Sequence, residues 1–219
     1  MILYHGSDKV ISKPLYGFGK KNNDYGQGFY CTEDIELAKE WACKDERGGF
    51  LNTYALNTEG LRILRLNDKS IIEWIAILLN NRIIRYSSPI EKRTAEYIIS
   101  HFIIDITEYD AVIGYRADDS YFSYTRAFLS NTISLQQLSY AMKLGDLGLQ
   151  FFVQSKEAFE RLVFVESSMV SGEVYSSKRF LRDNFARMSF NKMLEEEVAE
   201  GIFARDILKG ELGLNELCL

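Results

Sequence analysis

Short apolar runs bounded by turn residues predict the strands of this protein. One such run opens the chain and six others follow, some of them far apart. We expect strands at Ile2–His5, Gly28–Thr32, Phe50–Leu56, Leu61–Leu66, Ala111–Tyr115, Leu147–Val153 and Leu162–Glu166. The turn sequence Asn57-Thr58-Glu59-Gly60 separates the third run from the fourth and predicts that these two strands form a hairpin.

Longer stretches with apolar residues three or four positions apart predict helices between the strands. We expect a helix after Thr32, two helices within residues 69–104 broken near Ser87-Ser88-Pro89, and further helices at 121–130, at 134–143 and from Ser155. Thr32 is a suitable N-cap, because Glu33 and Asp34 would then lie in the first turn of its helix. By contrast, residues 12–28 are rich in glycine and polar residues and read as a long loop.

The final part of the chain is expected to be helical as well. Leu194, Val198 and Ile202 fall four positions apart and make one apolar stripe beside a group of glutamates. We therefore predict an α+β fold in which residues 1–170 form the main domain and residues 171–219 a helical extension packed on it.

Composition is that of a soluble globular protein, with 47% hydrophobic and 26% charged residues. The net charge of −5 is unevenly distributed. Residues 192–219 hold three basic and seven acidic residues, a net of −4, which leaves about −1 for the rest of the chain. No overall basic field argues for non-specific binding to nucleic acid.

Cysteine and histidine are too few and too scattered for a dedicated metal site. The three cysteines are Cys31, Cys43 and Cys218, and the chain has only two histidines. The longest apolar runs, such as Ile71–Leu79, are too short to span a bilayer, and the first residues lack the pattern of a secretory signal. We expect a cytoplasmic, reduced protein without membrane association.

The first candidate for chemistry is the segment Leu3-Tyr4-His5-Gly6-Ser7. A histidine at a strand end, followed directly by glycine, offers an imidazole and an open backbone at one place. Those groups suit a carboxamide and a ribose hydroxyl. The alternative interpretation is a structural histidine with its hydrogen bonds satisfied inside the protein.

The second candidate is Gly26-Gln27-Gly28-Phe29-Tyr30, which leads into a helix that carries Trp41. Tyr30 and Trp41 either pack in the core, as aromatic side chains usually do, or form a slot that holds a flat heterocycle between two rings.

Together the two segments resemble the catalytic core of the poly(ADP-ribose) polymerases and related diphtheria-toxin-type ADP-ribosyltransferases. In that family an aromatic-His-Gly-Ser strand and a loop precede Gly-x-Gly-[Ile/Phe]-Tyr and then a helix with small and aromatic residues. The similarity covers residues 3–43. It implies an ADP-ribosyltransferase-like split β-sheet core, NAD⁺ as co-substrate and transfer of ADP-ribose as the activity.

The resemblance also implies a role for each matching residue. His5 would hydrogen-bond the ribose next to nicotinamide, and the Gly6 backbone would pair with the carboxamide. Tyr30 would stack on the nicotinamide ring, and Trp41 would close its other face, where the family commonly has a second tyrosine. The NAD contacts expected from these segments are His5, Gly6, Ser7, Tyr30 and Trp41.

Two positions depart from the family pattern. Ala38 stands where many members have a serine that bonds the carboxamide, and Gln150 stands where the family has a catalytic glutamate opening a late strand. A carboxylate there stabilises the oxocarbenium-like transition state, whereas an amide can bond the ribose hydroxyl but supplies no charge. This departure favours single transfer over chain elongation.

The segment from Tyr115 to Phe122 is a third concentration of charged and aromatic residues. Arg116 is a candidate for the NAD diphosphate, and Asp118 or Asp119 for the acceptor side. Alternatively, Asp118, Asp119 or Ser120 caps the next helix and Arg116 is solvated.

Three further residues stand in the first loop. Lys20, Lys21 and Tyr25 either reach the adenosine end of NAD or belong to a mobile loop. His101, in an apolar helix, is expected to be structural.

The whole chain resembles small bacterial members of this superfamily that are often encoded beside a short partner gene. That similarity suggests the toxin of a toxin–antitoxin or phage-defence pair, acting as a mono-ADP-ribosyltransferase on a protein or nucleic-acid acceptor. The acidic segment from Lys192 would either contact a small antitoxin protein or form a solvated cap. An NAD glycohydrolase and a non-catalytic NAD- or ADP-ribose-binding module are the alternatives.

Overall fold

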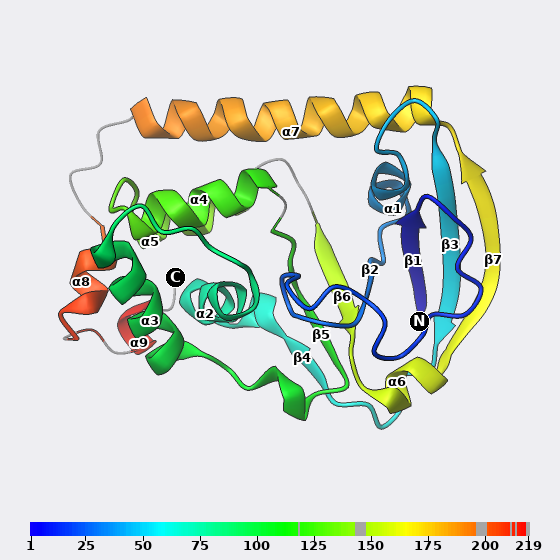
Figure 1. The fold of residues 1–219 in the computed structure, drawn as a ribbon, viewed down its shortest axis with the longest axis horizontal. Helices are drawn as coiled ribbons and strands as arrows, with labels where there is room; N and C mark the ends of the chain where they lie inside the picture. Colours follow the sequence, from blue (N-terminus) through cyan, green and yellow to red (C-terminus); the bar gives the residue numbers. More distant parts are fainter. Residues whose placement is uncertain (118, 143–147, 196–200, 211, 213, 218–219) are drawn as a thin grey trace.

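The strands of the protein form two separate β-sheets (Figure 1). The computed structural model describes residues 1–117, 119–142, 148–195, 201–210, 212 and 214–217. The first sheet is antiparallel and has the order β1-β3-β7, with bounds Ile2–Ser7, Gly49–Leu56 and Leu162–Val170. The second sheet has the order β2-β6-β5-β4, with bounds Phe29–Cys31, Leu149–Val153, Ala111–Tyr115 and Ile63–Arg65.

The two sheets contact each other through a backbone bridge and a shared core. The N–H groups of Tyr4 and Thr32 each donate to the carbonyl of the other, at 2.8 and 2.9 Å. A buried cluster then joins both sheets, with Leu3 and Tyr54 from the first and Phe29 and Phe151 from the second. Because β1 is bonded to the residue that follows β2, the residues of these two strands lie close together.

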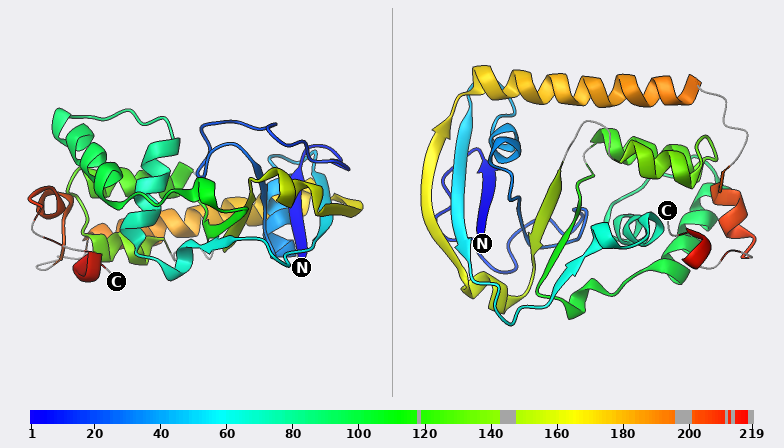
Figure 2. Two further views of the ribbon diagram at one scale, coloured as in Figure 1. Left: turned by 90° about the horizontal axis from the view of Figure 1, so that it is seen from below. Right: turned by 180° about the vertical axis from the view of Figure 1, so that it is seen from behind.

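Most of the helices gather beside the second sheet, whereas β7 of the first sheet lies at the opposite side of the molecule (Figures 1 and 2). The α-helices α1 to α9 have bounds Ile35–Ala42, Ile71–Asn81, Pro89–Phe102, Asp119–Leu129, Leu135–Ala141, Lys156–Glu160, Gly172–Glu195, Ala204–Leu208 and Leu214–Leu217. Two short 3₁₀ helices, η1 and η2, have bounds Leu66–Asp68 and Ile106–Glu108. Within the described residues, no helix is both long and apolar enough to traverse a bilayer.

The largest buried core lies among the helices and centres on the apolar helix α2. Trp74 and the neighbouring α2 residues are fully or almost fully buried. Phe190 of α7 and Ile207 of α8 belong to the same core, so helices from beyond residue 170 pack into it. The long helix α7 runs along one side of the molecule, from the first sheet to this helical end (Figure 1).

These elements confirm the predicted mixed α+β class and most of the predicted positions. The expected break between two helices is an example: α2 ends at Asn81, and α3 starts at Pro89. Ser88 caps α3 by accepting a hydrogen bond from Glu91 N–H, and proline is well tolerated in a first helical turn.

The predicted hairpin between residues 50–56 and 61–66 is wrong. The turn exists, since Leu61 N–H donates to Thr58 O. However, β3 pairs with β1 and β7, whereas β4 pairs in parallel with β5. Both edges of β3 are therefore occupied by strands distant in sequence, and the turn passes the chain from one sheet to the other.

The predicted N-cap of α1 is also wrong. Asp34 is the cap, and its side chain accepts from Glu36 and Leu37 N–H. Thr32 instead belongs to the bridge with Tyr4, and its hydroxyl donates to Leu149 O. The long-range contact holds Thr32 in extended backbone, so the helix begins later.

The apolar stripe predicted at Leu194, Val198 and Ile202 does not lie on one helix. α7 ends at Glu195, Val198 lies outside the described residues, and Ile202 is not helical. The Ile202 backbone instead bonds the start of α5, where Leu135 N–H donates to Ile202 O over 2.7 Å. Tertiary contacts with α5 thus replace the expected helix hydrogen bonds.

Candidate functional site

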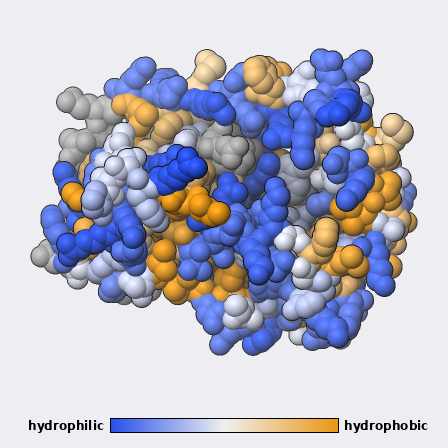
Figure 3. Space-filling view, viewed as in Figure 1, coloured by the Kyte–Doolittle hydropathy of each residue, from blue (hydrophilic) through white to orange (hydrophobic). Residues whose placement is uncertain are grey.

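A polar cavity of about 610 Å³ is lined by residues from several distant segments. Its wall is formed by β1, the first loop and β2, by α1 and the residues just after α1 and α2, by the end of β5 and the start of β6, and by α7. The lining residues are His5, Lys20, Asn23, Asp24, Tyr30, Trp41, Lys44, Arg82, Arg116, Ala117, Gln150, Arg179, Asp183 and Arg187. Figure 3 shows hydrophilic residues across the middle of one face of the molecule, below the long helix.

His5 lies at the cavity with its protonation state set by its surroundings. Nδ1 is 2.6 Å from Tyr30 O. Because a carbonyl only accepts, Nδ1 carries the hydrogen and Nε2 is left as an acceptor. Burial lowers the pKa of His5, and the hydrogen bond to Tyr30 opposes that effect. His5 is therefore held neutral, as an acceptor for a ligand hydroxyl.

Tyr30 is fixed by hydrogen bonds at its hydroxyl and by ring contacts. The hydroxyl donates to Gly26 O over 2.7 Å and accepts from Tyr25 N–H over 3.1 Å. Phe152 packs against the ring, with centroids 4.8 Å apart. Burial raises the pKa of Tyr30 far above its ordinary value, so the phenol stays protonated. The residue is a rigid aromatic wall and not a base.

Trp41 projects from α1 into the same cavity. The Arg116 guanidinium lies over its indole ring, 4.9 Å from the centroid. The indole Nε1 is buried, and no acceptor for it is found among the described residues. A buried donor without a partner is uncommon in native proteins and is expected where a ligand supplies the acceptor.

Gln150 is the second residue of β6 and is almost fully buried in the cavity wall. Its Nε2 donates to Asp24 Oδ2 over 2.9 Å and to Tyr115 O over 3.1 Å. The cavity thus joins His5, Tyr30, Trp41, Gln150 and Arg116, all of which the sequence had singled out.

Gly6 and Ser7 are not among the residues that line the cavity. Ser7 Oγ donates to Lys9 O and accepts from Asn52, so its hydroxyl serves the first sheet. Gly6 lies under α1, where a Cβ would be 1.9 Å from Ala38 O. The N–H and C=O of Tyr4 point toward Thr32. Every second residue of a strand directs these backbone groups to the same side, so the N–H and C=O of Gly6 also point away from β3.

Asp24 is a cavity residue that the sequence interpretation missed. It is 6% exposed, accepts from Ala117 N–H and Gln150, and lies 3.6 Å from an Arg82 nitrogen. Burial raises the pKa of Asp24, while its hydrogen bonds and the cations Arg82 and Arg116 lower it. No local pattern distinguishes it, because an aspartate in a glycine-rich loop normally reads as a turn residue.

The basic rim was also missed. The lining includes six basic residues against two acidic ones, although the whole chain carries −5. These basic residues are Lys20, Lys44, Arg82, Arg116, Arg179 and Arg187. Arg179 and Arg187 come from α7, where with Asp183 they are spaced four apart on one face. The sequence contains this four-residue spacing, but the glutamates after Lys192 make the C-terminal region as a whole acidic.

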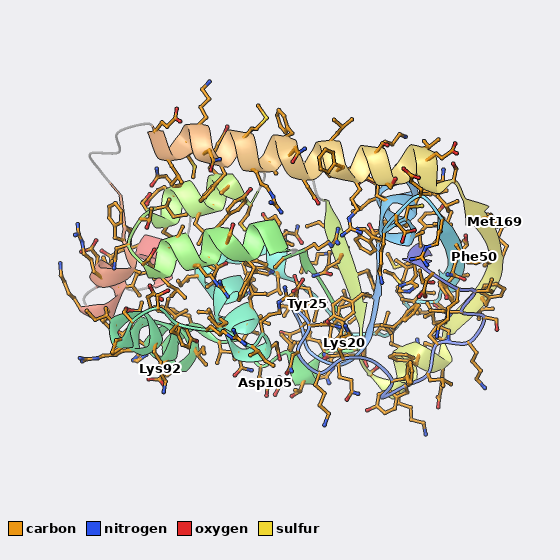
Figure 4. The ribbon with its side chains drawn as sticks, turned by 45° about the horizontal axis from the view of Figure 1, so that its top comes forward. Lys20, Tyr25, Phe50, Lys92, Asp105 and Met169 are labelled. Atoms are coloured by element: carbon orange, nitrogen blue, oxygen red, sulfur yellow. The ribbon has the colours of Figure 1, made fainter. Side chains whose placement is uncertain are left out.

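The remaining candidates are divided between this cavity and other places. Lys20 lines the cavity, whereas Lys21 and Tyr25 line a neighbouring one of about 560 Å³. Figure 4 labels Lys20 and Tyr25, which both belong to the first loop. Asp118 lies outside the described residues, and Asp119 is the first residue of α4. His101 is exposed on α3 and stacks on Tyr97, away from this cavity.

Comparison with known proteins places the chain in a family without assigning it an activity. No curated protein and no solved structure matches it. A family model described as "Protein of unknown function (DUF3990)" matches residues 1–164, which include every cavity residue except those of α7. The chain therefore belongs to the DUF3990 family.

Proposed function

We propose that the protein binds NAD⁺ in this cavity and transfers its ADP-ribose to a macromolecular acceptor. The observation that carries the proposal is the convergence of His5, Tyr30, Trp41 and Gln150, from distant segments, on one cavity with a basic rim. The two-sheet architecture supports an ADP-ribosyltransferase-like core, because β1 and β2 carry His5 and Tyr30 side by side at the junction of the sheets.

The aromatic residues suit the nicotinamide ring. Tyr30 offers a wall backed by Phe152, and Trp41 offers an indole face that now contacts the guanidinium of Arg116. A guanidinium and a nicotinamide ring of NAD⁺ are both flat, delocalised cations, and both are attracted to an aromatic face. Nicotinamide would take the place of the guanidinium, and Arg116 would turn to the diphosphate.

The polar groups suit the ribose and the phosphates. The neutral His5 presents Nε2 as an acceptor for a ribose hydroxyl. The basic residues of the rim suit the two negative charges of the diphosphate, since guanidinium and ammonium groups are the usual partners of phosphate oxygens. A cavity of this volume falls within the ordinary range for cofactor sites, roughly 300–1,000 Å³.

The reaction is a substitution at C1″ of the nicotinamide ribose. The bond from C1″ to the nicotinamide nitrogen breaks, and its electron pair leaves with nicotinamide. A lone pair of the acceptor forms the new bond to C1″, and the proton of the acceptor is released. Positive charge builds up on the ribose during this exchange, so negative groups beside it lower the barrier.

Calorimetry with a non-hydrolysable NAD analogue tests the pocket. We expect saturable binding by the wild type and at least a ten-fold weaker affinity for Tyr30→Ala, about 1.4 kcal/mol. Tyr140→Ala is the matched control, because that tyrosine is 59% exposed and does not line the cavity. Absence of binding at high micromolar analogue, with the three proteins alike, would contradict the proposal.

Labelled NAD⁺ and a cell lysate then separate transfer from hydrolysis. Label that resists protease but is lost on nuclease digestion indicates a nucleic-acid acceptor, and the reverse indicates a protein. Release of nicotinamide without labelled macromolecule would assign the protein as an NAD glycohydrolase instead.

A further inference from the structure

Asp24 and Gln150 form a buried pair in the wall of the cavity, although 126 positions separate them in the chain. Gln150 Nε2 donates to Asp24 Oδ2, which also accepts from Ala117 N–H over 2.9 Å. Asp24 Oδ1 faces the Arg82 guanidinium at 3.6 Å. Each contact of Asp24 is one in which a carboxylate oxygen accepts from a donor or pairs with a cation.

The contacts of Gln150 determine which of its atoms is offered to a ligand. An amide nitrogen carries two hydrogens, and Nε2 has two acceptors, Asp24 Oδ2 and Tyr115 O. Both hydrogens are therefore used. The carbonyl Oε1 is the group of Gln150 that remains, and it accepts hydrogen bonds as one oxygen of a glutamate would.

We propose that Asp24 and Gln150 together replace the single glutamate of the related transferases. Gln150 supplies the oxygen that accepts from the ribose hydroxyl. Asp24 is a positioning residue, which orients that amide and places a negative charge one hydrogen bond behind it. This inference rests on the proposed function, because it assigns parts within the same cavity.

The electrostatic effect of the pair follows from its burial. Asp24 is 6% and Gln150 4% exposed, so water screens the aspartate charge weakly. As the C1″–nicotinamide bond breaks, the ribose becomes positive and the charge of Asp24 stabilises it. Burial raises the pKa of Asp24, whereas its donors and the nearby Arg82 and Arg116 favour the carboxylate.

Asp24→Asn removes the charge and keeps an oxygen acceptor for Ala117 and Gln150. We expect the turnover number for nicotinamide release to fall about a hundred-fold, as for loss of other transition-state electrostatic groups. The dissociation constant for the NAD analogue should change less than about three-fold, because the effect belongs to the transition state. Asp68→Asn, at an exposed aspartate of η1, is the matched control.

The exchanged pair gives a signature that a structural role would not produce. Gln150→Glu alone places two carboxyl groups within hydrogen-bonding distance, so they share a proton and turnover does not rise. In the double variant Asp24→Asn/Gln150→Glu, the charge is restored on the other partner. We expect its turnover number to exceed that of Asp24→Asn by about ten-fold, close to 1.4 kcal/mol.

A carboxyl ¹³C NMR titration measures the pKa of the introduced glutamate and does not require enzymatic activity. The introduced glutamate should have a higher pKa in the single variant, where a second carboxyl group lies beside it, than in the double variant, where an amide donates to it. The inference alone is overturned if the wild type is active while Asp24→Asn keeps its turnover number, or if Gln150→Glu alone raises it. A wild type that neither binds the analogue nor releases nicotinamide overturns the proposed function and, with it, this inference.

Discussion

At the scale of single residues, the two histidines of the chain have opposite environments. His5 is held between Phe29 and the Tyr30 carbonyl, and burial lowers its pKa. His101 stands exposed on α3. A substitution of His5 therefore tests the cavity, and the same substitution of the exposed His101 is its control.

The lowered pKa of His5 predicts how stability depends on pH. His5 binds a proton less readily in the folded state than in the unfolded state. The contribution of the neutral His5 to the free energy of unfolding is therefore complete above pH 6.5. It is lost as the pH falls from 6.5 through the lowered pKa, by about 1.4 kcal/mol for each unit of difference. Melting curves between pH 7.5 and 5 should show this loss for the wild type and for His101→Gln.

His5→Gln should lose less melting temperature over the same range, because the titrating group is gone. Equal losses in the wild type and His5→Gln would mean that His5 is not held neutral by the fold. A ¹⁵N correlation spectrum gives a second reading: the hydrogen of the neutral ring should be on Nδ1.

Gly6 has a structural reason to be glycine that is independent of any ligand. A Cβ there would lie 1.9 Å from Ala38 O and 2.5 Å from Ala42 N, both backbone atoms of α1. α1 would have to move away from β1. We predict that Gly6→Ala costs about 3 kcal/mol in the free energy of unfolding, measured by urea denaturation.

Gly60→Ala is the control for this prediction, because it changes the backbone preference without placing a Cβ against a neighbouring atom. Gly60 has φ +77° with no atom near its would-be Cβ, so alanine there should cost only about 1 kcal/mol. Similar costs at Gly6 and Gly60 would contradict the close approach of α1 to β1.

At the scale of elements, α7 connects the two ends of the molecule and borders the cavity between them. In its first half, Lys178 pairs with Glu36 and Arg182 with the buried Glu40, both on α1. Lys39 and Lys178 lower the pKa of Glu36 to about 2. Farther along, Phe190 packs into the helical core. With both ends anchored, the helix holds Arg179 and Arg187 at the rim.

This placement predicts a contribution of α7 to binding of NAD. Arg179→Glu replaces a cation at the rim by an anion, which should weaken binding of the NAD analogue about ten-fold, or 1.4 kcal/mol. Lys192→Glu makes the same change of charge on the same helix at an exposed residue outside the cavity, and it should leave the affinity unchanged. Calorimetry at two salt concentrations measures both. An equal loss in the two variants would assign the effect to the overall charge of the molecule.

At the scale of the whole molecule, a protein with a net charge of −5 has a predominantly basic cavity. Composition alone indicates an acidic protein without an overall basic field. The structure separates the charges: six basic side chains from five parts of the chain line the cavity, together with only two acidic ones, Asp24 and Asp183. Net charge is therefore a poor guide to the charge of this cavity.

The sequence by itself determined the local features. Apolar periodicity located the strands and helices, because it depends on neighbours two to four positions apart. The two N-terminal segments identified His5, Tyr30 and Trp41 as candidates, and Gln150 was found by its strand context. All four line the same cavity.

Only the tertiary structure decided what depends on distant contacts. β4 pairs with β5 and not with β3. Thr32 bonds Tyr4 rather than capping α1. Asp24 bonds Gln150, which is 126 positions away in the chain. Each of these is a hydrogen bond or strand pairing across many residues, and no local pattern encodes the partner. Arg179 and Arg187 reach the cavity for the same reason: α7 passes over it only because both of its ends pack on other elements.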